Sequence, residues 1–171
     1  QAVSYGWEII SDGLAILTQA CLEAGADGIY YAALGGESYL FTDEEFDTYI
    51  KPHDLKVLKA AEDSPYNVLH ICKDRLNLER YRNYPCAVVN WGVYEQNPSL
   101  LEGAAIFPDK AILGGLDDRS GVLVDGTKEQ IQNEVNQILR MMDGRRFLLG
   151  ADCTLPTEIA YDRIHAAVEA V

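Results

Sequence analysis

A histidine and two cysteines are the residues of this sequence whose types and spacing could perform chemistry. His70 and Cys72 stand two positions apart at the end of an apolar run, so an extended strand would point both side chains to one face. Cys153 ends another apolar run. If both runs are parallel strands, all three side chains lie at the same end of a sheet. One imidazole and two thiolates are zinc ligands, and three protein ligands leave a fourth position open, as in catalytic zinc sites.

A structural role is the alternative for each of these residues. A strand cysteine is usually a small core residue, and a single histidine at a strand end more often forms a hydrogen bond than a metal bond. Spacing alone therefore leaves both interpretations open. The other two cysteines, Cys21 on an apolar helix face and Cys86 at the start of a strand, are predicted to be packing residues.

Strands and helices alternate along the chain in the order that would position these side chains. Helical spacing of apolar residues predicts helices over 5–23, over 43–62 with a bend near Pro52, and over 157–171. Thr127 and Gln130 form a capping box that opens a long helix to residue 142. Short helices are expected at 76–82 and after 97. Apolar runs predict five strands, at 26–33, 66–72, 86–93, 110–117 and 146–153.

The predicted fold is α/β, with parallel strands that are covered on both faces because they are nearly continuous apolar runs. The 171 residues suit a single domain, spanning 1–171. Five βα units are too few for a closed eight-stranded barrel, so either the sheet is open or three units are missing. The carboxyl ends of such strands carry the chemistry. Polar residues at these ends are therefore candidate site residues, and they include Glu37, Asn90 and Asp117.

Composition and charge exclude several functions. The net charge of −13 and the lack of a lysine- and arginine-rich stripe argue against a nucleic-acid binder. No apolar run approaches the ~18 residues of a membrane helix, and no secretory signal is present. We therefore predict a cytoplasmic protein whose four cysteines are free thiols.

Five segments follow one another in the order found in a known family. "GADGIYYA", "LHIC", "AVVNWGV", "AILGGLD" and "RFLLGADCTLP" resemble the uroporphyrinogen decarboxylase superfamily. The resemblance runs from about Ala24 to Val171 and corresponds to the C-terminal five βα units of that family's TIM barrel. It implies that the chain is a partial domain whose N-terminal βα units are missing.

The superfamily includes metal-free decarboxylases and zinc-dependent methyltransferases that use corrinoids. The methyltransferases carry a His-x-Cys followed later by a Cys as zinc ligands, which His70, Cys72 and Cys153 match. The decarboxylases carry a histidine near the position of Cys153. The resemblance thus implies zinc as cofactor and a methyl-corrinoid, either free methylcobalamin or one bound to a carrier protein, as methyl donor. A small thiol, activated as a thiolate on the zinc, would attack the corrinoid methyl group.

Two departures from the family pattern concern residues next to the expected site. Lys73 follows Cys72 where the family often has glycine, and it either faces an anionic substrate or points into solvent. Asn90 stands where the family usually has aspartate, and it either contacts the site or caps a loop. The resemblance also makes Glu37 a candidate fourth ligand or base. Asp117 is a candidate polar group at the barrel mouth, with loop capping as its alternative.

Two other functions stay open at this point. One is a porphyrinogen decarboxylase without metal, whose decisive aspartate and arginines would lie upstream. The other is an inactive half-barrel fragment with a structural or partner-binding role. Such a fragment would expose sheet edges and apolar surface, so we expect a homo-oligomer.

Overall fold

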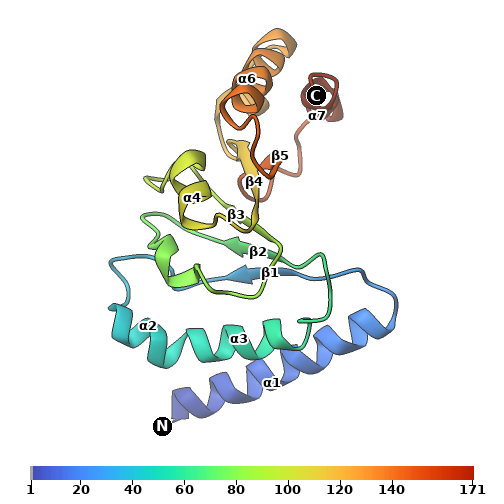
Figure 1. Ribbon diagram of the computed structural model, residues 1–171. Coiled ribbons are helices and arrows are strands. Elements are labelled where there is room, and N and C mark those ends of the chain that lie inside the picture. Colours follow the sequence, from blue (N-terminus) through green and yellow to red (C-terminus); the bar gives the residue numbers. More distant parts are fainter. Residues whose placement is uncertain (1) are drawn as a thin grey trace.

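The computed structural model describes residues 2–171, which form one parallel sheet with helices between the strands (Figure 1). The five strands follow one another in space as they do in the sequence, and every neighbouring pair is parallel. Their bounds are β1 Tyr30–Ala33, β2 Val68–Ile71, β3 Val88–Trp91, β4 Ala111–Leu116 and β5 Phe147–Ala151. The predicted parallel α/β arrangement is therefore confirmed, with strands shorter than the apolar runs suggested.

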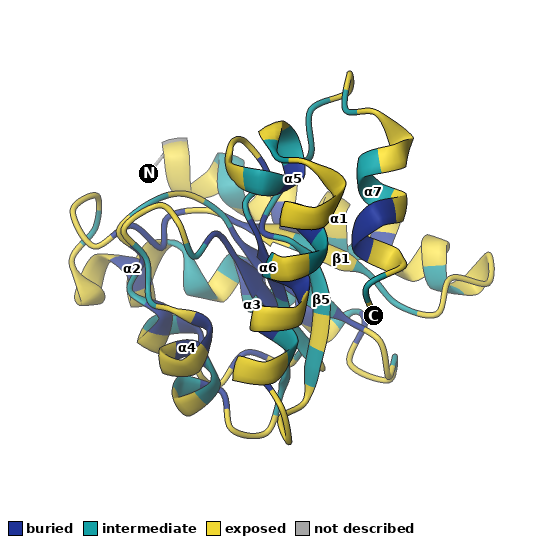
Figure 2. Cartoon of the chain, turned by 90° about the horizontal axis from the view of Figure 1, so that it is seen from above, coloured by how far each residue is buried: buried dark blue, intermediate teal, exposed yellow. Residues whose placement is uncertain are grey.

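Helices fill each connection between strands. They are α1 Ala2–Glu23, α2 Asp43–Tyr49, α3 Lys51–Lys59, the 3₁₀ helix η1 Leu78–Tyr81, α4 Leu100–Ile106, α5 Gly121–Asp125, α6 Lys128–Met141 and α7 Tyr161–Val168. The buried residues lie in the strands and on the helix faces that cover them, while the outward helix faces are exposed (Figure 2). The strand directions rotate from β1 to β5, as expected from the twist of a parallel sheet (Figure 1).

Local sequence signals account for most helix ends. The Thr127 hydroxyl accepts the Gln130 N–H and the Gln130 side chain accepts the Thr127 N–H, so the predicted capping box is present at the start of α6. The predicted bend near Pro52 is also confirmed, because α2 ends at Tyr49 and α3 begins with Pro52 in its first turn, where its missing N–H costs nothing.

Two helices differ from the prediction. The closing helix begins at Tyr161 instead of residue 157, because a turn bonded from Ile159 to Pro156 occupies the preceding segment and no side chain caps an earlier start. The short helix α5 was not predicted, since its five residues carry too little helical periodicity. Its Leu123 is buried, so tertiary packing decides its conformation.

The orientation of α1 is the main correction to the expected packing. The sequence predicted one apolar face with Cys21 as a packing residue on it, but Ile10 is 60% and Leu17 58% exposed, and Cys21 is exposed. The helix instead lies against α3 with Trp7, whose ring meets the His53 ring edge-on. Large apolar side chains therefore remain on the outside of α1.

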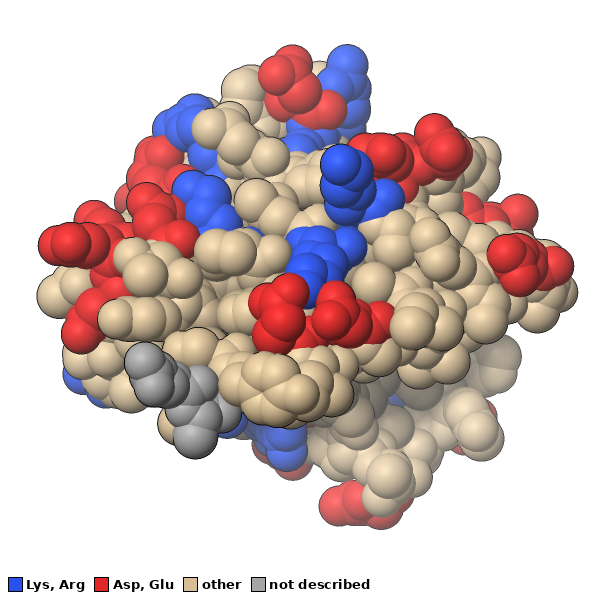
Figure 3. Space-filling view, turned by 90° about the horizontal axis from the view of Figure 1, so that it is seen from below, with Lys and Arg blue, Asp and Glu red and all other residues tan. Residues whose placement is uncertain are grey.

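Charge is scattered over this side of the molecule. Figure 3 views the protein from the side of α1 and shows small acidic and basic groups separated by uncharged surface. One such group joins Lys56 of α3 to Glu8 and Asp12 of α1. No helix in the described residues 2–171 is long and apolar enough to cross a membrane.

One buried residue of α3 is a carboxylate that contacts two tyrosines. Asp54 accepts hydrogen bonds from the hydroxyls of Tyr31 at 2.6 Å and Tyr84 at 2.9 Å. Burial raises the pKa of Asp54 from its usual 3.8 to about 6, against the opposing effects of the two tyrosines and the nearby His53. The folded protein therefore binds this proton more tightly than the unfolded chain does.

This carboxylate should make folding stability depend on pH. Because the folded pKa is the higher one, its contribution is fully present below pH 4 and is lost as pH rises through 6. A change from 3.8 to about 6 corresponds to about 3 kcal/mol. We expect Asp54→Asn, whose amide can still bond both tyrosines, to remove this difference. Urea unfolding of both proteins between pH 4 and 7 measures it. Parallel pH profiles for the two proteins would contradict the assignment.

Candidate metal centre

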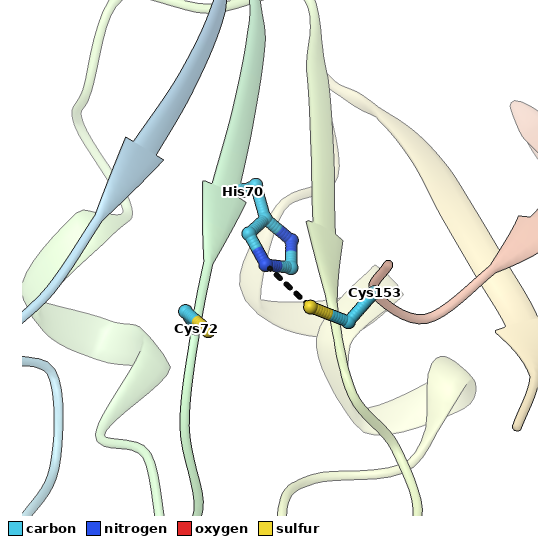
Figure 4. Close-up of side chains that lie close together, drawn as sticks. All are labelled: His70, Cys72 and Cys153. Atoms are coloured by element: carbon cyan, nitrogen blue, oxygen red, sulfur yellow. Dashed lines mark hydrogen bonds between the residues drawn. The ribbon is translucent and has the colours of Figure 1, made fainter. Parts of the chain in front are cut away.

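Parallel pairing brings the ends of β2 and β5 to the same end of the sheet. His70 is the third residue of β2, Cys72 directly follows that strand, and Cys153 follows β5. The three side chains converge although two other strands separate the elements that carry them (Figure 4). The nitrogen and sulfur atoms that could bind a metal all lie within 4.8 Å of one another. The Cys153 Sγ is 3.4 Å from the His70 Nε2.

Asn90 fixes which nitrogen of His70 faces the cysteines. The Asn90 Nδ2 donates to the carbonyls of Leu113 at 2.9 Å and Ala151 at 3.3 Å, so its Oδ1 must point the other way. That oxygen lies 2.5 Å from the His70 Nδ1, which must therefore carry the proton. The Nε2 lone pair is left free toward the two sulfur atoms. This is the arrangement in which proteins hold metal-binding histidines.

Tyr30 of β1 supports the same pair from the neighbouring strand. Its hydroxyl donates to the Asn90 Oδ1 at 2.9 Å, and its ring stacks on the His70 imidazole at 5.6 Å between centroids. Burial raises the pKa of Tyr30 to about 12, with further contributions from Cys153 and Cys72, so the hydroxyl keeps its proton and stays a donor. The imidazole is thus held on one edge and one face.

Burial also decides the protonation of the candidate ligands. It lowers the pKa of His70, against the effects of Asn90, Asp118 and Glu95, and so favours the neutral imidazole that binds metals. Burial raises the pKa of Cys72, and Cys153 adds to this, while the N–H and the charge of Lys73 oppose it. The thiol therefore keeps its proton more strongly than a free cysteine does, and binding of a metal cation would displace that proton.

The donor set fits zinc. Tetrahedral zinc with bonds of about 2.3 Å to sulfur and about 2.0 Å to nitrogen requires ligand atoms roughly 3.5–3.8 Å apart. The 3.4 Å between the Cys153 Sγ and the His70 Nε2 needs only a small side-chain adjustment to meet that spacing. The same distance also allows a thiol hydrogen bond to the imidazole, which is the structural alternative.

The remaining candidate residues lie in different surroundings. Asn90 is the partner of His70 described above, and is not a loop cap. Asp117 accepts hydrogen bonds from the N–H groups of Arg119 and Ser120 and from the Ser120 hydroxyl, so it caps its own loop. Glu37 is buried, and its Oε2 has no hydrogen-bond partner among the described residues 2–171. The structure does not bring Glu37 or Asp117 into the group of three.

Asp152 is a positioning residue that the sequence reasoning missed. Its carboxylate accepts the Gly115 N–H and the Val93 N–H, each at 2.7 Å, and so ties the ends of β3 and β4 to the segment that carries Cys153. Gly114 has a φ of +145°, and a Cβ there would stand 2.9 Å from the Asp152 Oδ1. In the sequence Asp152 resembles an ordinary loop residue, and no local pattern there indicates this contact with another strand.

A family comparison covers almost the whole chain. The family model described as "Uroporphyrinogen decarboxylase (URO-D)" matches residues 3–171. The chain belongs to the uroporphyrinogen decarboxylase family. The family resemblance predicted from the sequence is thereby confirmed. No curated protein sequence gives a significant match.

Solved structures share the fold of this uroporphyrinogen decarboxylase family member. A methyltransferase from Methanosarcina mazei has a TM-score of 0.79 at 22% identity over 95% of this chain and 47% of its own. A B12-independent methionine synthase from Shewanella sp. W3-18-1, in complex with selenomethionine, has a TM-score of 0.64 at 12% identity over 96% of this chain and 51% of its own. The chain therefore spans about half the length of these TIM-barrel-like structures, as predicted.

Lys73 shows how this member accommodates its departure from the family pattern. Its φ of 91° lies in the left-handed region that favours glycine, which is the residue that the family resemblance led us to expect here. Lys73 also lines a pocket of about 120 Å³ beside the candidate metal ligands. The lining residues are His70, Cys72, Lys73, Gly92, Glu95, Asp118, Arg119 and Cys153.

Proposed function

We propose that this protein transfers a methyl group between a corrinoid and a small thiol, with zinc held by His70, Cys72 and Cys153. The observation that carries the proposal is the convergence of these side chains at one end of the sheet, with the His70 Nε2 lone pair aimed at the sulfur atoms. Membership of the uroporphyrinogen decarboxylase family and the likeness to a methyltransferase support it.

The chain's own residues prepare the site for such a reaction. Asn90 and Tyr30 hold the imidazole in its metal-binding tautomer, and Asp152 holds the segment of Cys153. A zinc ion at these ligands would supply the positive charge that lowers the pKa of a substrate thiol and gives a thiolate near neutral pH. The pocket beside Cys72 and Cys153 leaves room for the thiol to reach the ligand group.

The corrinoid enters this proposal as a substrate, either free methylcobalamin or one presented by a carrier protein. In the transfer, a bond forms between the thiol sulfur and the methyl carbon. The bond between that carbon and cobalt breaks, and its electron pair stays with the corrinoid. A metal-free porphyrinogen decarboxylase is the runner-up, but decarboxylation assigns no role to the converging His70, Cys72 and Cys153. A cytoplasmic location and a homo-oligomeric state stay predictions.

The test compares the two reactions on the protein expressed from its complete reading frame. Zinc-loaded protein is mixed with methylcobalamin and a small thiol, and the methylated thiol is quantified by mass spectrometry. We expect methyl transfer that stops on zinc chelation and returns on adding zinc. No methyl transfer, together with loss of carboxyl groups from a porphyrinogen that is insensitive to chelation, would establish the decarboxylase instead.

A further inference from the structure

Charged residues of both signs surround the pocket beside the candidate metal ligands. Two are acidic, Asp118 and Glu95, and two are basic, Lys73 and Arg119. The pocket is therefore balanced in charge, although the whole chain carries a net charge of −13. Charges of both signs at one pocket could pair with opposite charges on a bound molecule.

Both acidic residues line the same pocket as His70. Asp118 is only 5% exposed, and its Oδ2 accepts the Arg119 Nε–H at 3.1 Å. A buried carboxylate requires a donor or a cation, and its only described ion-pair partner, Arg119, is a mostly exposed side chain. An ammonium group entering the pocket would supply a second partner.

Both basic residues line this pocket as well, and Lys73 directly follows Cys72 in the chain. Arg119 extends from the buried Asp118 toward solvent, with 70% of its side chain exposed. Its guanidinium keeps free N–H groups that suit a carboxylate. The backbone of Lys73 has the left-handed conformation that favours glycine. Unlike glycine, the lysine places a positive charge next to Cys72.

We propose that the thiol substrate is zwitterionic, an amino-acid thiol whose ammonium group meets Asp118 and Glu95 and whose carboxylate meets Lys73 and Arg119. This inference rests on the proposed function. A purely anionic thiol would pair with Lys73 and Arg119, but it would bring no cation to Glu95 and would leave Asp118 with the exposed Arg119 alone. A purely cationic thiol would satisfy the carboxylates but leave Lys73 and Arg119 unmatched. Only a molecule with both charges pairs with all four side chains.

Thiol binding can be measured without methyl transfer. Protein from the complete reading frame is loaded with Co²⁺ in place of zinc, and thiols are titrated while the sulfur-to-cobalt absorption is recorded. The probes are homocysteine and cysteine, which are zwitterionic, 3-mercaptopropionate, which is anionic, cysteamine, which is cationic, and 2-mercaptoethanol, which is uncharged. We expect homocysteine or cysteine to bind about tenfold more tightly than any of the other three.

Variants assign each charge to its partner. Asp118→Asn and the exposed Glu95→Gln should weaken homocysteine binding about tenfold and leave 3-mercaptopropionate binding unchanged. Lys73→Gly, which also relieves the backbone conformation at φ 91°, should weaken homocysteine and 3-mercaptopropionate but not cysteamine. Glu129→Gln on α6 and Lys59→Ala on α3 are matched controls on exposed helix positions remote from the pocket, and should change none of these affinities.

The results distinguish failure of the zwitterionic-substrate inference from failure of the proposed methyltransferase function. Equal or tighter binding of 3-mercaptopropionate, or equal binding of all the thiols, would overturn the zwitterion while leaving a thiol-binding metal site in place. Absence of any spectral change with every thiol would overturn the proposed function itself. Preferential binding of homocysteine that is weakened by Glu95→Gln and by Lys73→Gly as described supports the inference even if Asp118→Asn does not fold.

Discussion

Replacing Cys153 with serine is expected to abolish stoichiometric zinc binding. The sulfur lies 3.4 Å from the His70 Nε2 and is one of the three candidate ligands grouped within the described residues 2–171, so its loss leaves an incomplete site. Loss of a residue that merely orients a ligand typically costs 10–100-fold in metal affinity, and loss of a ligand should exceed about 100-fold. Serine keeps the size and the hydrogen bond to His70, so the fold should be unchanged.

Metal content by elemental mass spectrometry checks this expectation. The protein is purified without chelator and without nickel affinity, and about one zinc per chain is expected for the unmodified protein. Cys21→Ser is the matched control, because that cysteine is exposed on α1 and lies outside the ligand group. Full zinc content in the Cys153→Ser protein would return the three residues to a structural role.

Replacing Asn90 with alanine is expected to weaken zinc binding by about 10–100-fold without unfolding the protein. The side chain is what forces the proton onto the His70 Nδ1, and without it the imidazole can rotate or change tautomer. Asn90→Asp should recover only part of the affinity. Its carboxylate can accept from His70, but it cannot donate to the Leu113 and Ala151 carbonyls.

Competition with a zinc-binding dye measures these affinities, and circular dichroism at the same temperature reports the fold. The exposed Asn136 of α6, whose amide contacts only its own helix, provides the control Asn136→Ala. Unaltered zinc affinity in a folded Asn90→Ala protein would mean that another group orients His70. A loss of affinity in proportion to a loss of folded protein would make Asn90 a structural residue only.

Local patterns predicted the framework of this fold. The apolar runs around Leu69, Val89 and Ile112 mark strands because parallel strands are covered on both faces, and all three residues are buried. The Thr127 capping box and Pro52 mark helix ends because their effects act within one turn. Parallel strand direction predicts that His70, Cys72 and Cys153 lie at the same end of the sheet, but their approach to within 4.8 Å across two intervening strands depends on the curvature of the sheet.

Contacts between distant segments could not be predicted in this way. Asp152 and Asp118 resemble ordinary loop residues in the sequence, and their roles depend on amides and side chains of other strands and loops. Asp117 has a similar position in the sequence, but its carboxylate accepts the N–H groups of Arg119 and Ser120 in its own turn. The prediction that Cys21 packs against neighbouring residues was wrong, because that face of α1 is exposed. Apolar spacing identifies a helix face but does not show which neighbour covers it.

The placement of the three candidate ligands links metal occupancy to the integrity of the sheet's rim. His70 lies in the interior strand β2 and Cys72 directly follows it, whereas Cys153 follows β5, which pairs with one neighbour within the described residues 2–171. Edge strands are the segments that most readily open in local fluctuations. A cation held by all three would clamp that strand to the interior, and each opening of the strand would release the cation. By linkage, cation binding at this site stabilises the paired state of β5, and loss of that pairing weakens cation binding. A measurement of either equilibrium therefore reports on the other.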